Sequence, residues 1–432
     1  MVKPSSILGK NARSQLFSYL HNTTRGKRIA TSKLLAKRVL KEAGIPVPST
    51  FKIFKNPKDI MEFDWNSLPD SFALKPNKGL GGEGIIVVKK RAKDKGVWIT
   101  ANREKVTTDD LKLHVMDILE GAYSLKNVPD RAFIEEYIGR HKAFRKYAFR
   151  GFPDIRIIVF NKVPVMAMMR VPTKESGGRA NLHQGAIAVG IDIATGITTR
   201  AFWKGKYIKY KPDTKKKLNG IKIPKWTSIL EMATNCSVPA QLGLYGADIV
   251  LHPEKGPMVL ELNYQPGLNI QYANKAGLRK RLERVEDLEV KDAEHGVMIA
   301  KALFAARFAD RVAAKEGVKT INVWEQVKIL FKDKRKLEVS AKIDTGAWRT
   351  SIDRTLARDL GLLHEENILW SKIFKSGLGN QERKVINVTF WLAGRKIKTI
   401  ASVADRSKLR TPLIIGRRDL AGFLVQPQKK KE

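Results

Sequence analysis

The pattern of hydrophobic and polar positions changes once along the chain, near Gly317. Before that residue, short apolar runs typical of strands alternate with stretches whose apolar residues have helical spacing. After it, short strand-like segments follow one another with few helical stretches between them. We therefore expect an α+β domain over residues 1–317 and a small, mostly β domain over residues 318–432.

Three segments have the spacing of amphipathic helices. The first covers residues 28–43, and its apolar side chains near helical positions are Ile29, Leu34, Leu35, Val39 and Leu40. Gly44 follows it, and two prolines shortly afterwards favour a helix end there. The same spacing predicts helices over residues 225–235 and 292–316.

Apolar and β-branched runs predict strands on both sides of Gly317. In the first part they are SFALKP (71–76), GIIVVKK (84–90), FIEEYI (133–138), DIRIIVF (154–160) and VPVMAMMRV (163–171). In the second part they are EVSAKID (338–344), KVINVTFWL (384–392), KIKTIASVAD (396–405) and TPLIIG (411–416).

The segment GADIVLHPEKGPMVLELNYQPGLN contains a candidate metal site. Two strand-like halves flank the turn-forming sequence HPEKGP. Because alternate residues of a strand share a face, Glu261 and Asn263 point the same way, and a hairpin would bring Asp248 alongside. Two carboxylates and an amide oxygen suit a Mg²⁺ ion bound jointly with phosphates. The alternative is a polar strand face with ordinary ion pairs.

A second candidate site is the glycine-rich sequence LKPNKGLGGEGIIVV. A strand delivers Lys75, and a loop follows that contains Gly79, Gly81, Gly82 and Gly84. Glycines let backbone N–H groups approach phosphate oxygens closely, and a lysine adds a point charge. A strand follows the loop, which excludes both the P-loop and the Rossmann pattern. A plain glycine-rich hairpin is the alternative.

Strand ends and polar loops supply the remaining candidates. FIEEYI would present backbone groups to an adenine edge where its strand ends. Arg156 and Arg170 fall on successive strands, and Arg179 and Asn181 follow in a polar loop. Strand arginines beside a nucleotide would stabilise charge on a transferring phosphoryl group. The alternative is that these arginines are surface or salt-bridged residues.

Taken in order, these segments resemble the ATP-grasp superfamily, and within it the alpha-L-glutamate ligases of the RimK type, over about residues 10–300. The resemblance implies ATP as substrate and Mg²⁺ as cofactor, with Mn²⁺ as a possible replacement. It implies that Lys33 and Lys75 contact phosphates beneath loop 79–84. It also places a further set at the nucleotide, namely Glu136, Tyr137, Ile138, Asp154, Arg179 and Asn181, and makes Asp248, Glu261 and Asn263 the Mg²⁺ ligands.

The activity implied by this resemblance is carboxylate–amine ligation. ATP would phosphorylate a carboxylate, and an amine would then attack the acyl phosphate. Glutamate and a peptide or protein acceptor are the implied substrates. The chain departs from the pattern in two places. Only 32 residues precede Lys33, where relatives usually carry a further α/β domain, and Ser32 stands where they tend to have an acid. The basic segment GRHKAFRKYAFRGFP would suit an acidic acceptor.

The second part contains VSAKIDTGAWRTSID and, further on, TPLIIGRRDL. Over residues 322–427 it resembles the retropepsin fold of the family called ATP-dependent zinc proteases, or RimB-like. The resemblance implies a catalytic Asp344, and we add the hypothesis that SGLGN (376–380) is a flap tip. A single aspartate requires a second copy of the chain, and therefore a homodimer. No zinc site is evident, since this part has no cysteine and His364 is its only histidine. The alternative is a β domain without protease activity.

The charge is unusually positive, with 81 Lys and Arg against 43 Asp and Glu, a net +38. Such a field attracts polyanions, although a generally basic proteome would also explain it. We see no zinc finger, helix-turn-helix or aromatic-interleaved motif that favours RNA or DNA. A non-enzymatic polyanion-binding protein on an ATP-grasp scaffold is therefore one alternative function, and a ligase for a small molecule is another.

The remaining expectations concern location. The single cysteine, Cys236, excludes an internal disulfide. No apolar run is long enough for a membrane span, and the first residues lack the apolar core of a secretory signal. We therefore expect a cytoplasmic protein.

Overall fold

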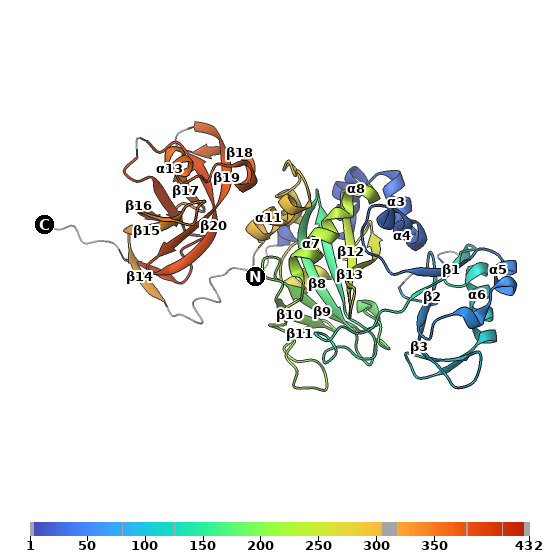
Figure 1. Ribbon diagram of the computed structural model, residues 1–432. Coiled ribbons are helices and arrows are strands. Elements are labelled where there is room, and N and C mark those ends of the chain that lie inside the picture. Colours follow the sequence, from blue (N-terminus) through green and yellow to red (C-terminus); the bar gives the residue numbers. More distant parts are fainter. Residues whose placement is uncertain are drawn as a thin grey trace. The chain divides into compact units, whose positions relative to one another are not determined.

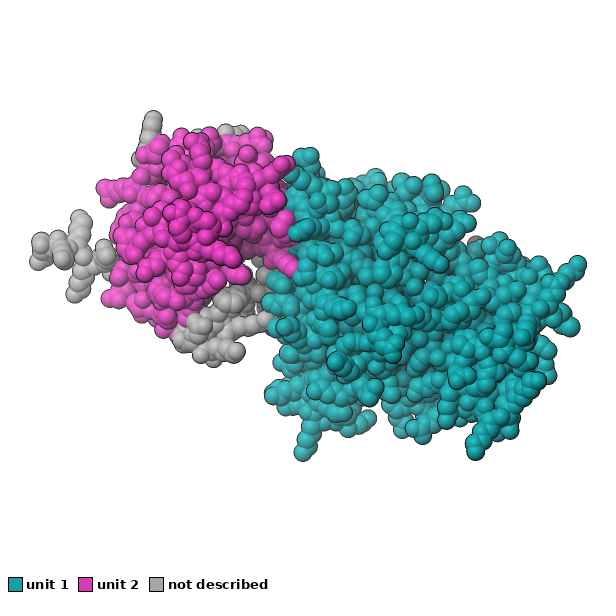
Figure 2. Space-filling view, viewed as in Figure 1, with its two compact units in different colours: residues 1–297 teal, residues 298–432 magenta. Residues whose placement is uncertain are grey.

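The computed structural model describes residues 4–79, 81–124, 127–304, 318–376, 379–407 and 409–426 (Figure 1). It contains two compact units, unit 1 over residues 1–297 and unit 2 over residues 298–432 (Figure 2). Helix α11 (Ala293–Phe304) spans the division and confirms the first half of the predicted 292–316 helix. The rest of that helix and the predicted boundary at Gly317 lie outside the described residues. In the described ranges, every helix is too short or too polar to cross a membrane.

The predicted helix over residues 28–43 is two helices, α3 (Thr24–Thr31) and α4 (Lys33–Glu42). Ser32 between them is extended, and its hydroxyl accepts a hydrogen bond from the Leu35 amide. Serine favours this N-cap position because its side chain satisfies an amide that the helix leaves unpaired. The predicted end at Gly44 is confirmed. Shorter helices precede α3, namely η1 (Pro4–Ser6), α1 (Lys10–Ala12), η2 (Arg13–Ser18) and α2 (Tyr19–His21).

The first sheet of unit 1 has six strands in the order β1-β6-β2-β3-β4-β5. They are β1 (Thr50–Phe54), β2 (Phe72–Pro76), β3 (Ile86–Arg91), β4 (Val97–Thr100), β5 (Lys105–Thr107) and β6 (Ala132–Glu136). Helices α5 (Pro57–Glu62) and α6 (Thr108–Glu120) both begin with capping boxes, and η3 (Trp65–Ser67) lies between α5 and β2. The helices and the sheet share an apolar core built around Phe54, Phe72 and Trp98.

The second sheet of unit 1 has seven antiparallel strands in the order β11-β10-β9-β8-β7-β12-β13. They are β7 (Asp154–Phe160), β8 (Val163–Val171), β9 (Ile187–Ile191), β10 (Thr198–Trp203), β11 (Lys206–Ile208), β12 (Leu244–His252) and β13 (Gly256–Asn263). Every residue of β7 is buried, which explains its nearly continuous apolar sequence.

Helix α7 (Trp226–Asn235) confirms the predicted helix and packs against β7, β8, β12 and β13 (Figure 1). Helix α9 (Ile270–Asn274) packs against β8, β9 and β10. The unit also contains η5 (Leu182–Gln184), α8 (Ser237–Ala240) and α10 (Arg279–Glu283). The α+β prediction for this part of the chain is therefore confirmed.

Unit 2 is built around a closed six-stranded barrel. The sheet order is β15-β16-β21-β17-β20-β19-β18, and β15 also pairs with β19, which closes the ring. The strands are β15 (Trp324–Leu330), β16 (Lys336–Asp344), β17 (Thr350–Asp353), β18 (Ile368–Ser376), β19 (Gly379–Leu392), β20 (Arg395–Ala404) and β21 (Leu413–Gly416). Apolar side chains from these strands fill the barrel.

Outside the barrel, β14 (Lys319–Asn322) pairs in parallel with β22 (Phe423–Gln426). Helix α13 (Arg354–Asp359) and η6 (Glu365–Asn367) lie between β17 and β18 in the sequence. The mostly β architecture predicted after residue 317 is thus confirmed.

Candidate active site

The β12–β13 hairpin brings the three predicted metal ligands together. Asp248 lies opposite Glu261 in the register, and the Asn263 amide nitrogen is 3.4 Å from Asp248 Oδ2 and 3.3 Å from Glu261 Oε1. Leu262 is buried on the other face, as alternation along a strand requires. The predicted grouping of these three side chains is confirmed.

The chemistry of this donor set fits a magnesium ion. Turning the Asn263 amide would present its oxygen beside the two carboxylates, because oxygen and nitrogen in an amide occupy equivalent positions. The set contains only two acidic groups. Accordingly, no cluster of three or more His, Cys, Asp or Glu able to hold a metal occurs in the part of the chain that the structure describes. A site of this kind needs phosphate oxygens to complete a magnesium shell.

Both strand arginines are bound to carboxylates in the same place. Arg156 donates from Nε and Nη2 to the two oxygens of Asp248, at 2.7 and 2.6 Å. Arg170 donates to both oxygens of Asp154 and, at 2.7 Å, to Asp248 Oδ2. The salt-bridged alternative for these arginines is therefore what the structure shows, and their action on a transferring phosphoryl group stays a prediction.

Burial and charge set the protonation of the two aspartates in opposite directions. Burial alone would raise the pKa of Asp248, but the charges of Arg156 and Arg170 lower that pKa below its ordinary value. Burial raises the pKa of Asp154 to about 6 despite the Arg170 guanidinium beside it. Asp248 is therefore ionised at neutral pH, as a metal ligand must be.

The two predicted phosphate-binding lysines have different partners. Lys33 begins α4, and its Nζ donates to Gly79 O at 2.8 Å, which ties the helix to the glycine-rich loop. Burial lowers the pKa of Lys33, and the charge of Glu261 acts to raise it. Lys75 on β2 instead forms an ion pair with Glu135 on β6. The charge of a candidate metal ligand therefore acts on Lys33, whereas Lys75 is bound to Glu135.

Glu135 is a site residue that the sequence interpretation missed. Its carboxylate is only 2% exposed, and it pairs with Lys37 at 2.5 Å as well as with Lys75. Burial would raise the pKa of Glu135, but Lys75 and Lys37 together lower it. The available signal was an acid inside the apolar strand FIEEYI, whose β-sheet neighbour contains Lys75.

The described residues of loop 79–84 lie against the polar loop that contains Arg179 and Asn181. The Asn181 side chain donates to Gly81 O at 2.7 Å, and a Cβ on Gly82 would lie 4.0 Å from Arg179 Cδ. Gly84 differs, since a Cβ there would lie 2.5 Å from the Tyr123 ring. Gly84 therefore serves packing, whereas Gly81 and Gly82 face the polar loop predicted to meet the nucleotide.

The predicted adenine border follows the end of β6. The Glu136 amide donates to Ser49 O at 2.8 Å, and its carboxylate pairs with Lys255. Ile138 is buried in a small apolar cluster with Val250. In this segment the side chains fix the path of the chain, which leaves the backbone around Tyr137 as the candidate for contact with a base.

In unit 2, Asp344 ends β16 at a tight turn. Its Oδ1 accepts from the Gly346 and Ala347 amides at 2.9 and 3.0 Å. Gly416 lies opposite Asp344 in the β16–β21 register, so the two motifs singled out in this part of the sequence meet. The predicted flap tip at 376–380 includes residues that lie outside the described ones.

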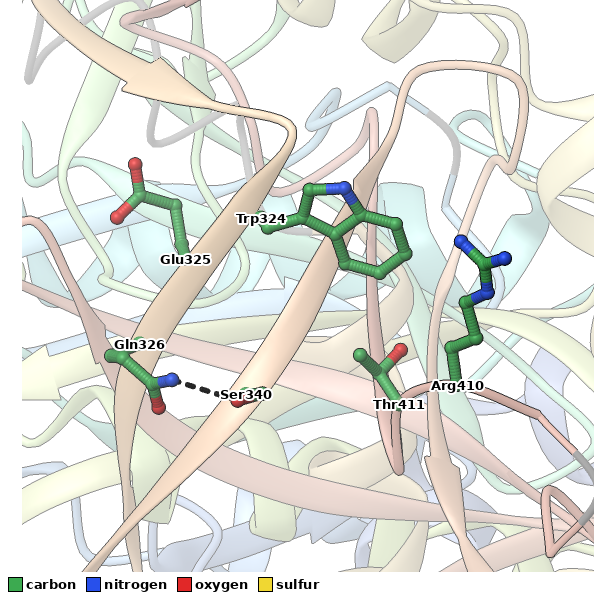
Figure 3. A pocket seen from close by; sticks show the side chains of 6 residues that line it. All are labelled: Trp324, Glu325, Gln326, Ser340, Arg410 and Thr411. Carbon is green, nitrogen blue, oxygen red and sulfur yellow. Dashed lines mark hydrogen bonds between the residues drawn. The ribbon is translucent and has the colours of Figure 1, made fainter. Parts of the chain in front are cut away.

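Residues of β15 and β16 and of the segment before β21 border a cavity of about 390 Å³, which is lined by Trp324, Glu325, Gln326, Ser340, Arg410 and Thr411 (Figure 3). Figure 3 shows Trp324, Thr411 and Arg410 grouped together, while Gln326 donates to Ser340 at 2.7 Å. Trp324 faces Lys342 in the register, two residues before Asp344 on β16.

A comparison with solved structures finds chains that match parts of this one at low sequence identity. The ATP-grasp ligase PsnB, complexed with a minimal precursor, is 15% identical with a TM-score of 0.33, over 61% of this chain and 63% of that one. The chain thus spans less than two thirds of PsnB. D-alanine–D-alanine ligase from Bacillus anthracis is 15% identical, with a TM-score of 0.33 over 68% and 72%. Simian foamy virus protease is 18% identical, with a TM-score of 0.17 over 22% and 90%.

No substrate of this chain follows from these likenesses, and no curated protein matches it. The profile of one family, described as Sugar-transfer associated ATP-grasp, matches residues 12–287. That range contains both sheets of unit 1 and every candidate nucleotide and metal residue described above. The chain therefore belongs to the sugar-transfer associated ATP-grasp family.

Proposed function

We propose that unit 1 is an ATP-dependent carboxylate–amine ligase that forms ADP through an acyl-phosphate intermediate. The observation that carries this proposal is the grouping of Asp248, Glu261 and Asn263, with Arg156 and Arg170 bound to Asp248. The charge of Glu261 also acts on the pKa of Lys33. Hard oxygen ligands beside fixed positive charge suit phosphoryl transfer, which depends on positioning and electrostatic stabilisation.

In this proposal, Asp248, Glu261 and Asn263 would hold Mg²⁺, or Mn²⁺ in its place, and the ion would neutralise charge on the phosphates. Lys33 and Lys75 would contact the phosphates from beneath loop 79–84. Arg179 and Asn181 would hold that loop closed and exclude water from the acyl phosphate. Arg156 and Arg170 would take up charge in the transition state.

The proposed substrates are glutamate and a peptide or protein acceptor, on the strength of the RimK-type resemblance. The basic segment 139–153 supports an acidic acceptor, since its exposed side chains include Lys142, Arg145 and Lys146. A small-molecule acceptor is the second candidate. A cytoplasmic location is proposed with this function, because the chain has a single, buried cysteine.

The test is an assay of the purified chain with Mg-ATP and each amino acid in turn, with and without an acidic peptide. We expect ADP release and a product heavier by one amino-acid residue. Glu261→Ala should abolish the product, whereas Glu254→Ala, an exposed acid in the turn of the same hairpin, should not. AMP release would contradict the acyl-phosphate mechanism. Absence of any ATP turnover would instead favour the non-enzymatic scaffold.

For unit 2 we propose a retropepsin-like peptidase that trims the amide-linked product. The observation that favours it is the Asp344 turn opposite Gly416. Because one aspartate cannot share a proton with itself, two copies of the chain would form the site. Peptide release should disappear in Asp344→Asn, persist in the exposed control Asp333→Asn, and be unaffected by a zinc chelator. Undiminished release in Asp344→Asn would refute this activity.

A further inference from the structure

The surface formed by β10, β11 and α9 carries a fixed aromatic cluster, here called the aromatic platform (Phe202, Tyr207 and Tyr272). The Phe202 ring stacks on Tyr272 at 5.0 Å with an interplanar angle of 11°. Tyr207 meets Phe202 edge-on at 5.4 Å, and its hydroxyl donates to Tyr272 O at 3.0 Å. Tyr272 is 56% exposed and Tyr207 is 49% exposed. The rings are thus held by their neighbours and still face solvent.

Lysines surround this platform in unusual number. Residues 203–225 contain nine lysines and one acid, Asp213. Lys275 lies 5.9 Å from the centre of the Tyr207 ring, and Lys209 lies 5.5 Å from that of the exposed Tyr210. The exposed lysines of the segment are Lys204, Lys206, Lys209, Lys215, Lys216, Lys217, Lys222 and Lys225. Of these, Lys204 pairs with Glu175 at 2.7 Å.

The positive surface continues beyond this segment. Lys216 Nζ donates to Lys146 O at 3.1 Å, which brings the lysine run against the basic stretch that contains Arg145. Burial, and after it the charge of Lys216, lowers the pKa of Lys211. A polyanion would relieve this repulsion.

The exposed rings distinguish among polyanions. An acidic peptide would satisfy the lysines but leave the aromatic faces uncovered. A helix that lies on an anionic membrane surface usually presents Trp, Phe or Leu to the lipid. Among the described residues, however, the strongly exposed large hydrophobic side chains of this surface are all tyrosines: Tyr207, Tyr210 and Tyr272. Single-stranded nucleic acid offers phosphates to lysines and flat bases to aromatic rings at once.

We propose that this surface binds single-stranded nucleic acid, with bases stacked on the aromatic platform and phosphates on Lys206, Lys209 and Lys275. Binding at this surface needs no nucleotide. In WKGKYIKYK (203–211) lysines alternate with Tyr207 and Tyr210, so this segment interleaves aromatic and basic residues.

The experiment is fluorescence anisotropy of a labelled oligothymidylate with the full chain, without ATP, over a series of salt concentrations. For single strands each phosphate contact contributes about 0.7 to the slope of log affinity against log salt. We expect Lys209→Gln to reduce that slope by about this amount. We expect Tyr272→Leu to weaken binding about tenfold and leave the slope unchanged, because it removes stacking and no charge.

Two matched controls lie elsewhere on unit 1. Tyr19 is 49% exposed and has Lys27 5.0 Å from its ring, so Tyr19→Leu tests whether any exposed tyrosine beside a lysine suffices. Lys90→Gln removes an exposed charge from β3. Both should bind as the parent does. Equal binding by Tyr272→Leu and the parent would overturn the proposal. A competition assay gives a second outcome that would overturn it. In that assay, polyglutamate or phosphatidylserine vesicles would displace the labelled oligonucleotide as well as unlabelled oligonucleotide does at the same concentration of negative charge.

Discussion

Lys75 and Glu135 form a buried ion pair between β2 and β6, beside the candidate phosphate site. Glu135 also pairs with Lys37, so one carboxylate balances two ammonium groups, of which Lys37 is buried and Lys75 is partly exposed. Lys75 therefore depends on Glu135 both for its position and for its charge. This dependence suggests a test of stability that does not require the substrate to be known.

Glu135→Gln should destabilise unit 1 by roughly 3–5 kcal/mol, because it leaves the buried Lys37 and the partly exposed Lys75 without their counter-charge. The folded pKa of Glu135 is lowered, so its contribution is present above the ordinary range of a glutamate. It is lost as the pH falls through the folded pKa. Denaturant unfolding at pH 7 and at lower pH measures the difference between variant and parent, which should shrink on acidification. The exposed Glu120→Gln is the control.

Arg170→Lys should reduce the ligation rate roughly 10²–10³-fold if Arg170 stabilises the transition state. Lysine is a point charge and cannot bind Asp154 on two oxygens while also reaching Asp248. Steady-state kinetics should show kcat falling with little change in the KM for ATP. Arg279→Lys, in an exposed pair with Glu283, is the control. A raised KM with unchanged kcat would show instead that Arg170 only organises the binding site.

Ser32→Ala should cost about 1 kcal/mol through loss of the α4 cap. Ser32 also donates to Asn77 Oδ1 at 2.9 Å, close to the Asn77 carbonyl that Lys33 approaches. We therefore expect a raised KM for ATP in addition to the lower stability. Thr31→Ala, one residue earlier and exposed, should change neither. An unchanged KM for ATP in Ser32→Ala would show that Ser32 caps α4 but does not position Lys33.

Cys236 should report the opening of unit 1. The thiol is buried, and burial raises its pKa to about 12. Since the thiolate is the reactive form, a disulfide reagent should not label the native protein at pH 8, and labelling should appear on addition of denaturant. The native rate should stay low between pH 7 and 9, where an exposed thiol ionises. Rapid stoichiometric labelling without denaturant would contradict this burial.

The elements that the sequence predicted best are those whose burial is uniform. DIRIIVF and VPVMAMMRV correspond to β7 and β8 residue for residue, because both strands lie in the middle of a covered sheet. The helix over 28–43 was predicted as one because its apolar spacing continues through Ser32. The capping preference of serine outweighs that spacing, and the chain becomes extended for one residue.

In the candidate site, too, some residues could be predicted from the sequence and others could not. Asp248, Glu261 and Asn263 were predictable because a short hairpin brings them together. Glu135 was not, because its pairing with Lys37 and Lys75 depends on strand neighbours far apart in the sequence. Closure of the unit 2 barrel through β15 and β19 is non-local for the same reason. The metal ligands could be predicted from a short stretch of sequence. The ion pairs of Glu135 with Lys37 and Lys75 could be recognised only in the folded structure.

The parallel pairing of β14 with β22 has a consequence for synthesis. Lys319–Asn322 has no strand to pair with until Phe423–Gln426 has been made, although a whole barrel is encoded between them. Unit 1 can fold on the ribosome as soon as it emerges, since domains form as units during translation. In unit 2, β14 can pair only after β22, near the end of the chain, has been synthesised. A premature stop codon shortly before residue 423 would therefore leave β14 unpaired, whereas unit 1 would still fold.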